Sequence, residues 1–225
     1  VGSEMCIRDR ATDANGIFAV DEWAKHQNCQ VLEPARIKAV SGKLLAGQTA
    51  SVWSEFPLPG AAPAGVIPTQ TQDAADFALT LFPAGNALHL VPRIGVLGVG
   101  CKRGTTAEQL ETAFAAFCEA HGLAPACICA AASIDLKQNE AGLLAFCQVH
   151  RWKVSFYSAA QLQAAPGTFT PSHFVQSVTG VDNVCERAAV RTAGGPIRIP
   201  KQAGGGVTFA LALRPYAPDW RWQHE

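Results

Sequence analysis

The sequence predicts an α/β protein: a C-terminal three-layer α/β/α domain with a mostly parallel sheet, preceded by a smaller α/β domain. From residue 94 onward, apolar runs of strand length alternate with amphipathic helical segments, the pattern of helices that cross between parallel strands. The run at 127–134 is continuously small and apolar, as expected for a strand covered on both faces. The chain has 225 residues, of which 48% are hydrophobic and 16% charged, enough for one large or two small domains with real cores.

Composition excludes several classes of protein. Lys and Arg number 18, as do Asp and Glu, so no overall basic field favours binding to nucleic acid or to an anionic membrane. The low charge and a mean hydropathy of +0.10 argue against intrinsic disorder. No apolar stretch approaches the roughly 18 residues that a membrane helix needs. We therefore expect a soluble, cytoplasmic protein.

The eight cysteines do not form a metal-binding pattern. The sequence contains no Cys-x-x-Cys pair and no Cys/His group with zinc-site spacing. Cys118 and Cys147 fall on apolar helical faces, and Cys127 and Cys129 fall in a strand-like run. We expect buried, reduced thiols and no metal ligands.

The first ten residues, VGSEMCIRDR, do not read as the start of a protein. They carry no Met at the first position and no helical or strand period, and they resemble translated sequencing-adaptor read-through. We expect 1–10 to be non-native and Ala11 to continue a longer gene product.

Residues 11–93 predict the smaller domain. A short amphipathic helix is expected around 18–24. A second is expected over 34–45, with a proline near its start and Gly47 just after its end. The alternating segment 50–56 and the run 87–91 predict strands, and the Pro/Gly/Ala-rich stretch 57–68 predicts a loop.

Residues 94–225 predict the larger domain. A helix over 105–121 is indicated by a capping box, Thr105 with Glu108, and by the stop at Gly122. The tail 216–225 contains two tryptophans and shows no hydrophobic periodicity of a helix or a strand. The other elements expected are strands at 94–99, 127–134, 153–157, near 197 and at 207–213, and helices at 139–149, 172–178 and 182–192.

The segment GVGCKRGTT, residues 98–106, joins a strand to a helix and predicts an anion site. Its glycines let backbone amides approach a ligand, and the helix start adds free N–H donors and a partial positive charge. Lys102 and Arg103 add full charges at the carboxyl end of a strand, where open α/β sheets bind ligands. Phosphate or carboxylate would suit this loop; a tight turn with incidental surface cations is the alternative.

The same segment does not match a dinucleotide-binding motif. Its third glycine, Gly104, falls one residue later than G-x-G-x-x-G requires. The acidic residue expected about 20 positions further on is missing from the second strand, and Glu119 lies inside a helix instead. A nucleotide-binding enzyme is therefore disfavoured.

A second polar segment, SIDLKQNE at 133–140, follows the next strand. Asp135 or Glu140 could act as a general base, and Lys137 could hold a substrate carboxylate or lower the pKa of a neighbour. The alternative is a helix N-cap region with Asn139 or Asp135 as the cap, and one carboxylate can fill both roles.

Other candidates are weaker. Glu186 on a late helix and Lys201 at a strand end are residue types that are more often solvated charges. Of the scattered histidines, only His173 beside Ser172 falls near an expected loop. No G-x-S-x-G segment is present, so a serine-hydrolase triad is not supported.

Five segments, in this order and spacing, resemble the C-terminal domain of the CbiG/CobE family of cobalamin biosynthesis. They are GVGCKRGTTAEQLE, SIDLKQNEAGLLAF, FYSAAQL, TGVDNVCERAAV and IPKQAGGGVTFALA, of which GCKRGTT and IDLK are the specific parts. Upstream, ATDANGIFAVDEWAK, ARIKAVSGKLLAG and VWSEFPLPG resemble the end of the CbiG N-terminal domain and its central domain. CbiG is therefore favoured over CobE, which resembles the C-terminal domain alone.

The chain also departs from the family pattern. Arg187 is unusual, because VCERAA stands where the family more often has VAEAAA, whereas Glu186 matches. Ser133 replaces a more usual Thr and keeps the hydroxyl. The family's GHxGGAN-type segment would lie upstream of Ala11.

The resemblance implies the hydrolysis of cobalt-precorrin-5A in the anaerobic route to vitamin B12. In that reaction water opens the ring-A δ-lactone and acetaldehyde leaves, giving cobalt-precorrin-5B. Cobalt arrives in the substrate, so no cofactor is expected. The expected partners are this anionic tetrapyrrole, other cobalamin-pathway enzymes and a second copy of the chain, but not nucleic acid or membrane.

The catalytic residues expected on these grounds are Asp135 or Glu140 as the base, with Lys137 beside them. If the chemistry belongs to the part upstream of Ala11, the chain is instead a non-catalytic, CobE-like tetrapyrrole-binding or carrier module. The residues expected to bind substrate are Gly98, Gly100, Cys101, Lys102, Arg103, Gly104, Thr105, Thr106, Ser133, Glu186 and Lys201.

Overall fold

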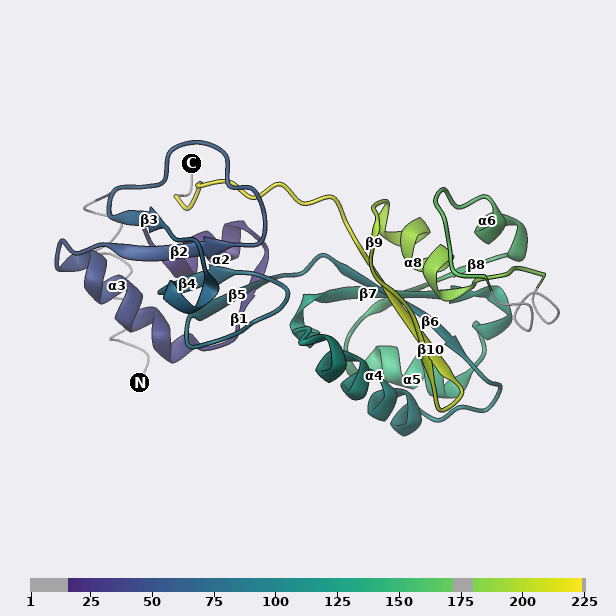
Figure 1. Ribbon diagram of the computed structural model, residues 1–225. Helices are drawn as coiled ribbons and strands as arrows, with labels where there is room; N and C mark the ends of the chain where they lie inside the picture. The colour runs from purple at the N-terminus through teal and green to yellow at the C-terminus, as the bar shows by residue number, and fades with distance from the viewer. Residues whose placement is uncertain (1–15, 172–179, 224–225) are drawn as a thin grey trace. The chain divides into compact units, whose positions relative to one another are not determined.

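The computed structural model describes residues 16–171 and 180–223, which form two compact units, each with its own five-stranded sheet (Figure 1). The first unit contains 16–93 together with 217–223, and the second contains the remainder. The predicted α/β class is confirmed. The expected non-native segment 1–10 and the expected helix 172–178 lie outside the described residues.

The sheet of the first unit has the order β1-β5-β4-β2-β3. Its pairings are parallel except at β1, which runs antiparallel to β5. The strand β3, in a stretch predicted to be loop, pairs with β2, because three residues are too few for a strand pattern to show. The elements are α2 (Val20–His26), β1 (Cys29–Val31), α3 (Ile37–Leu45), β2 (Ala50–Ser54), β3 (Val66–Pro68), β4 (Phe77–Leu79) and β5 (Leu88–Pro92).

The C-terminal tail packs in the first unit, although the sequence pattern grouped it with the second domain. The Trp220 ring stacks on Trp23 with centroids 5.3 Å apart. Trp222 meets Phe18 edge-on at 5.3 Å, and Trp23 Nε1 donates to the Asp219 carbonyl at 2.6 Å. Aromatic burial therefore attaches the tail to this core.

The sheet of the second unit has the order β8-β7-β6-β10-β9. The first three strands are parallel, whereas β10 runs antiparallel to both β6 and β9. Because β9 runs with β6 again, the sheet is mostly parallel in strand direction. The elements are β6 (Gly95–Cys101), α4 (Ala107–His121), β7 (Ile128–Ile134), α5 (Ala141–Val149), β8 (Lys153–Tyr157), α6 (Ala159–Gln163), α8 (Cys185–Ala193), β9 (Ile197–Gly204) and β10 (Val207–Leu213).

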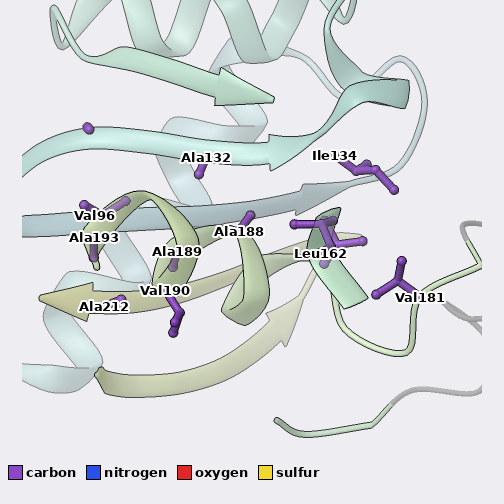
Figure 2. Packing of buried hydrophobic residues seen from close by; sticks show 12 residues of the cluster. Val96, Ala132, Ile134, Leu162, Val181, Ala188, Ala189, Val190, Ala193 and Ala212 are labelled. Atoms are coloured by element: carbon purple, nitrogen blue, oxygen red, sulfur yellow. The ribbon is translucent and has the colours of Figure 1, made fainter. Parts of the chain in front are cut away.

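Helices cover both faces of this second sheet: α4 and α5 lie on one face, and α6 and α8 lie on the other (Figure 1). The α4 face is aromatic, with Phe114 and Phe146 meeting edge-on at 5.8 Å. The α8 face is built from small residues such as Ala132, Ala188 and Ala189, which allow helix and sheet to approach closely (Figure 2). The predicted three layers are present.

Helix starts in the second unit differ from the sequence prediction by two or three residues. The capping box of α4 is formed by Thr106 and Gln109 rather than by Thr105 and Glu108. The Thr105 hydroxyl donates instead to the Lys102 carbonyl at 2.9 Å, so it belongs to the preceding turn. The helix α5 begins at Ala141 instead of 139, without a side-chain cap. The helix expected over 182–192 is α8, which begins at Cys185.

Candidate functional site

Glu140 joins the two polar loops that the sequence analysis identified. One carboxylate oxygen accepts from the Gly104 amide at 3.0 Å, and the other accepts from Lys137 Nζ at 3.0 Å. The hydrogen bond from Gly104, with the nearby charges of Lys137 and Arg103, holds the pKa of Glu140 below its ordinary value. The carboxylate that occupies the glycine loop is thus the protein's own.

Several backbone groups of the loop are also hydrogen-bonded within the protein. The Lys102 carbonyl accepts a hydrogen bond from the Thr105 amide at 3.4 Å. The Lys102 amide donates to the Gly206 carbonyl at 3.1 Å. The Thr106 amide donates to the Gln109 side chain at 2.9 Å. The Lys102 and Arg103 side chains are exposed and form no hydrogen bond with a described residue, so they are the loop's groups that can meet a ligand.

Five of the expected binding residues lie in strands of the sheet: Gly98, Gly100 and Cys101 in β6, Ser133 in β7 and Lys201 in β9. Ser133 is fully buried, and its hydroxyl donates to the Val99 carbonyl at 2.7 Å. Gly98 lies under α8, where an added Cβ would come within 1.8 Å of the Cys185 carbonyl oxygen. Burial raises the pKa of Cys101, so its sulfur is a thiol at neutral pH. Ser133 therefore links β7 to β6, and Gly98 allows α8 to pack closely on the sheet.

Asp135 is the remaining carboxylate of the second loop. It begins the 3₁₀ turn η4 (Asp135–Lys137) directly after β7 and is partly exposed. Its side chain makes no hydrogen bond with any residue that the structure describes. Glu140, in contrast, is bound to Lys137 and has a lowered pKa, which makes it a weak base. The geometry therefore favours Asp135 over Glu140 as a general base.

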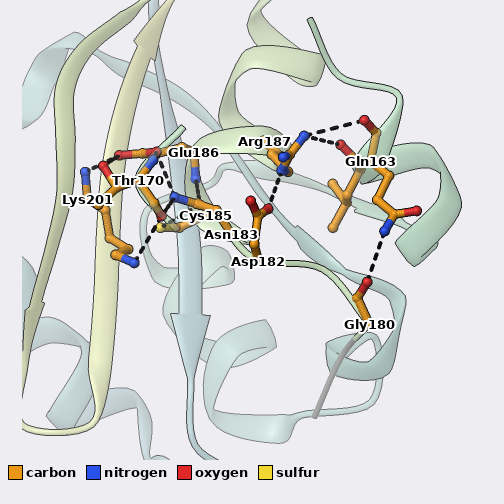
Figure 3. A network of polar contacts seen from close by, with 10 residues as sticks. Gln163, Thr170, Gly180, Asp182, Asn183, Cys185, Glu186, Arg187 and Lys201 are labelled. Carbon is orange, nitrogen blue, oxygen red and sulfur yellow. Dashed lines mark hydrogen bonds and ion pairs between the residues drawn. The ribbon is translucent and has the colours of Figure 1, made fainter. Parts of the chain in front are cut away.

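Glu186 and Lys201 meet in a separate cluster, on the α8 face of the sheet (Figure 3). The Glu186 side chain is 2% exposed, and its carboxylate accepts from the Lys201 amide at 2.7 Å. It also accepts from the Thr170 amide at 2.8 Å, the Thr170 hydroxyl at 3.1 Å and Asn183 Nδ2 at 2.6 Å. This saturated carboxylate joins α8, β9 and the segment at 170.

Asn183 is a member of this cluster that sequence reasoning missed. Its side-chain oxygen accepts from the Glu186 amide at 2.9 Å, while its Nδ2 donates back to the Glu186 carboxylate. The spacing Asn183-x-x-Glu186 is that of a capping box and could have revealed the pair. Nothing in the local sequence points to Thr170.

Arg187 holds the neighbouring segment (Figure 3). Its Nε donates to Asp182 at 2.9 Å, and its guanidinium lies 4.5 Å from the centre of the Phe169 ring. Sequence reasoning assigned no role to either partner.

A cavity of about 760 Å³ opens on the same face, and sequence reasoning missed it as well. None of the predicted site residues lines it. Its walls are Tyr157, Pro166, Gly167, Thr168, Phe169, Val190, Arg191, Gly194, Gly195, Pro196 and Ile197.

The described residues show neither a metal-binding group nor a membrane-spanning helix. Among the described residues, no three His, Cys, Asp or Glu side chains are grouped so that they could hold a metal ion. None of the helices in residues 16–171 and 180–223 is long and apolar enough to cross a bilayer.

The chain is similar to proteins of cobalamin biosynthesis. A family model described as "Cobalamin synthesis G C-terminus" matches residues 95–212. Cobalt-precorrin-5A hydrolase from Priestia megaterium is 32% identical over 132 residues, which are 58% of this chain and 35% of that protein. The protein of the same name from Salmonella typhimurium is 28% identical over 218 residues, which are 90% of this chain and 62% of that protein.

One solved structure supports the same relationship. The crystal structure of CobE, described as a protein from the cobalamin (vitamin B12) biosynthetic pathway, is 30% identical and superposes with a TM-score of 0.50. The match covers 56% of this chain and 94% of that one. The chain spans 35% and 62% of the length of the two hydrolases above. Because the family model matches more than half of the chain, this protein belongs to the CbiG/CobE family of cobalamin-biosynthesis proteins.

Proposed function

We propose that this chain is part of a cobalt-precorrin-5A hydrolase of anaerobic cobalamin biosynthesis. The enzyme would open the ring-A δ-lactone of its substrate with water and release acetaldehyde, giving cobalt-precorrin-5B. The observation that carries the proposal is the match to a protein of that name along 90% of this chain. The polar loops at the carboxyl ends of β6 and β7 would form the reaction site.

In this proposal Asp135 is the general base. It would take a proton from water as the water oxygen attacks the lactone carbonyl carbon, breaking the ring C–O bond to leave a carboxylate and a hydroxyl. Deprotonation of that hydroxyl and cleavage of the adjacent C–C bond would release acetaldehyde, with the electron pair passing into the conjugated macrocycle. Lys102 and Arg103 would bind carboxylates at the substrate rim, because their side chains are exposed and form no hydrogen bond with a described residue.

A second candidate is a CobE-like module that binds or carries a tetrapyrrole without chemistry. It is favoured by one observation: the chain covers 94% of the CobE structure. Acetaldehyde release separates the two candidates, because a carrier only binds.

The test mixes the purified chain, from Ala11 onward, with enzymatically generated cobalt-precorrin-5A and measures acetaldehyde through a coupled dehydrogenase. We expect one equivalent of acetaldehyde per substrate, and we expect Asp135→Asn to abolish turnover while retaining binding. Glu119→Gln, which neutralises an exposed carboxylate on α4, is the matched control and should turn over normally. Binding without acetaldehyde would favour the carrier, and undiminished turnover by Asp135→Asn would refute the assignment of the base.

A further inference from the structure

The cavity on the α8 face has the dimensions of a ligand site. Its volume of about 760 Å³ lies within the range of roughly 300–1,000 Å³ typical of small-molecule pockets. Tyr157 at the end of β8 and the segment 166–169 form part of its wall. The C-terminal half of α8, through Val190 and Arg191, and the turn at 194–197 complete it.

The chemistry of the wall combines flat apolar groups with one cation. The rings of Tyr157, Phe169 and two prolines offer surfaces suited to a conjugated ring. The Arg191 guanidinium lies 5.3 Å from the centre of the Tyr157 ring. This side chain is exposed and makes no ion pair or hydrogen bond with a described residue. A guanidinium so placed can bind a carboxylate through two parallel hydrogen bonds.

The Phe169 wall is held in place from two sides. Glu186 binds both the amide and the hydroxyl of the next residue, Thr170. The Arg187 guanidinium lies against the Phe169 ring at 4.5 Å and is itself bound to Asp182. The buried carboxylate and this arginine therefore act as positioning residues that keep the cavity formed without a ligand.

We infer that this cavity is a second corrinoid site, distinct from the proposed reaction site at the loops after β6 and β7. It would bind the macrocycle of a carboxylate-bearing corrinoid, with Arg191 pairing with one carboxylate and Tyr157 and Phe169 flanking the ring. The choice of a corrinoid rests on the proposed function. The preference for a flat ring that carries a carboxylate rests on the cavity itself. Arg191 would select carboxylates over amides, because an amide has no charge to pair with a guanidinium.

Isothermal titration calorimetry on the full chain tests this with two probes. Dicyanocobyrinic acid carries free carboxylates on a corrin ring, and dicyanocobinamide carries amides on the same ring. We expect the acid to bind more tightly, and Arg191→Gln to weaken its binding by about tenfold while leaving that of the amide unchanged. The variant Arg191→Lys should retain part of the preference for the acid over the amide.

Two further variants control for net charge and for folding. Lys153→Gln removes one exposed cation at the opposite end of β8 from Tyr157 and should bind like the wild type. Thr168→Trp places a ring in the cavity from an exposed position and should weaken the binding of both probes. Circular dichroism of each variant establishes that the fold is retained.

The outcomes for this site and for the proposed reaction are separable. Equal affinity of wild type and Arg191→Gln for the acid, or unchanged binding by a folded Thr168→Trp, would overturn the assignment of the cavity even if acetaldehyde is released. Arg191-dependent binding without acetaldehyde release would support the cavity site and count against catalysis by this chain.

Discussion

The Glu140 carboxylate accepts a hydrogen bond from the Gly104 amide at 3.0 Å, across 36 positions of sequence. This contact joins the loop after β7 to the loop after β6, and the ion pair with Lys137 holds the Glu140 carboxylate within its own loop. An anion site that local sequence would assign to a ligand is thus already occupied from within the chain. At this edge the side chains of Lys102, Arg103 and Asp135 form no hydrogen bond with a described residue, and we propose that these are the groups that meet the substrate.

Replacing Glu140 with Gln should destabilise the second unit modestly. The amide retains an acceptor for Gly104 but loses the charge that pairs with Lys137, so we expect about 1 kcal/mol in the free energy of unfolding. Urea denaturation measures it, with Glu119→Gln as the exposed control. A loss no larger than that of the control would show that the contact does not support the loops.

The contribution of Glu140 should depend on pH in one direction. Its folded pKa is lower than the ordinary 4.5, chiefly because of the Gly104 amide. The stabilisation is therefore fully present above pH 4.5 and is lost as the pH falls through the lowered folded pKa. Denaturation curves of wild type and Glu140→Gln should converge in acid. A stability gap that stays constant down to pH 2 would contradict this.

Gly98→Ala should be strongly destabilising and Gly100→Ala nearly neutral. A Cβ at 98 would lie 1.8 Å from the Cys185 carbonyl oxygen, whereas one at 100 would lie 3.5 Å from the nearest atom, on Thr208. Displacing a helix backbone is costly, so we expect a loss of about 3 kcal/mol for the first variant. Thermal denaturation of the two variants side by side gives the comparison. Similar melting temperatures would mean that α8 does not need this glycine.

Glu186→Gln should be more damaging than its conservative character suggests. The carboxylate accepts four hydrogen bonds, and a glutamine would turn an NH₂ donor toward donors of Thr170, Asn183 or Lys201. We expect a loss of about 3 kcal/mol in the free energy of unfolding. Hydrogen exchange at the Thr170 and Lys201 amides should accelerate. Unchanged exchange at both amides would remove Glu186 from its positioning role.

Three buried cysteines should resist alkylation in the native protein. Burial raises the pKa of Cys118, Cys147 and Cys185 to about 12, so almost no thiolate exists at pH 8. Iodoacetamide labelling followed by mass spectrometry should modify them only after denaturation. Cys29, which is partly exposed, serves as the internal comparison. Rapid native labelling of Cys185 would show that α8 opens readily.

Local patterns predicted most elements of the second unit. The strands β6 and β7 are nearly continuous apolar runs, and α4 carries an apolar stripe, so their positions follow from short-range sequence. Short elements could not be predicted. The strand β3 has three residues, and its parallel pairing with β2 depends on a distant segment. The cavity could not be predicted from the sequence, because Tyr157, Phe169 and Arg191 lie on separate elements and share no motif.

By itself, the sequence determined the α/β class, the order of the main elements of the second unit and which polar loops follow β6 and β7. Only the tertiary structure decided how the polar groups are used. Glu140 was a candidate base by residue type, but the approach of Gly104 and Lys137 makes it a bound carboxylate with a low pKa. Gly98 was expected to let a ligand approach the backbone, but the space beside it is filled by the backbone of α8. The reason is physical: periodicity reports local burial, whereas the partner of a polar group depends on which distant segments pack beside it.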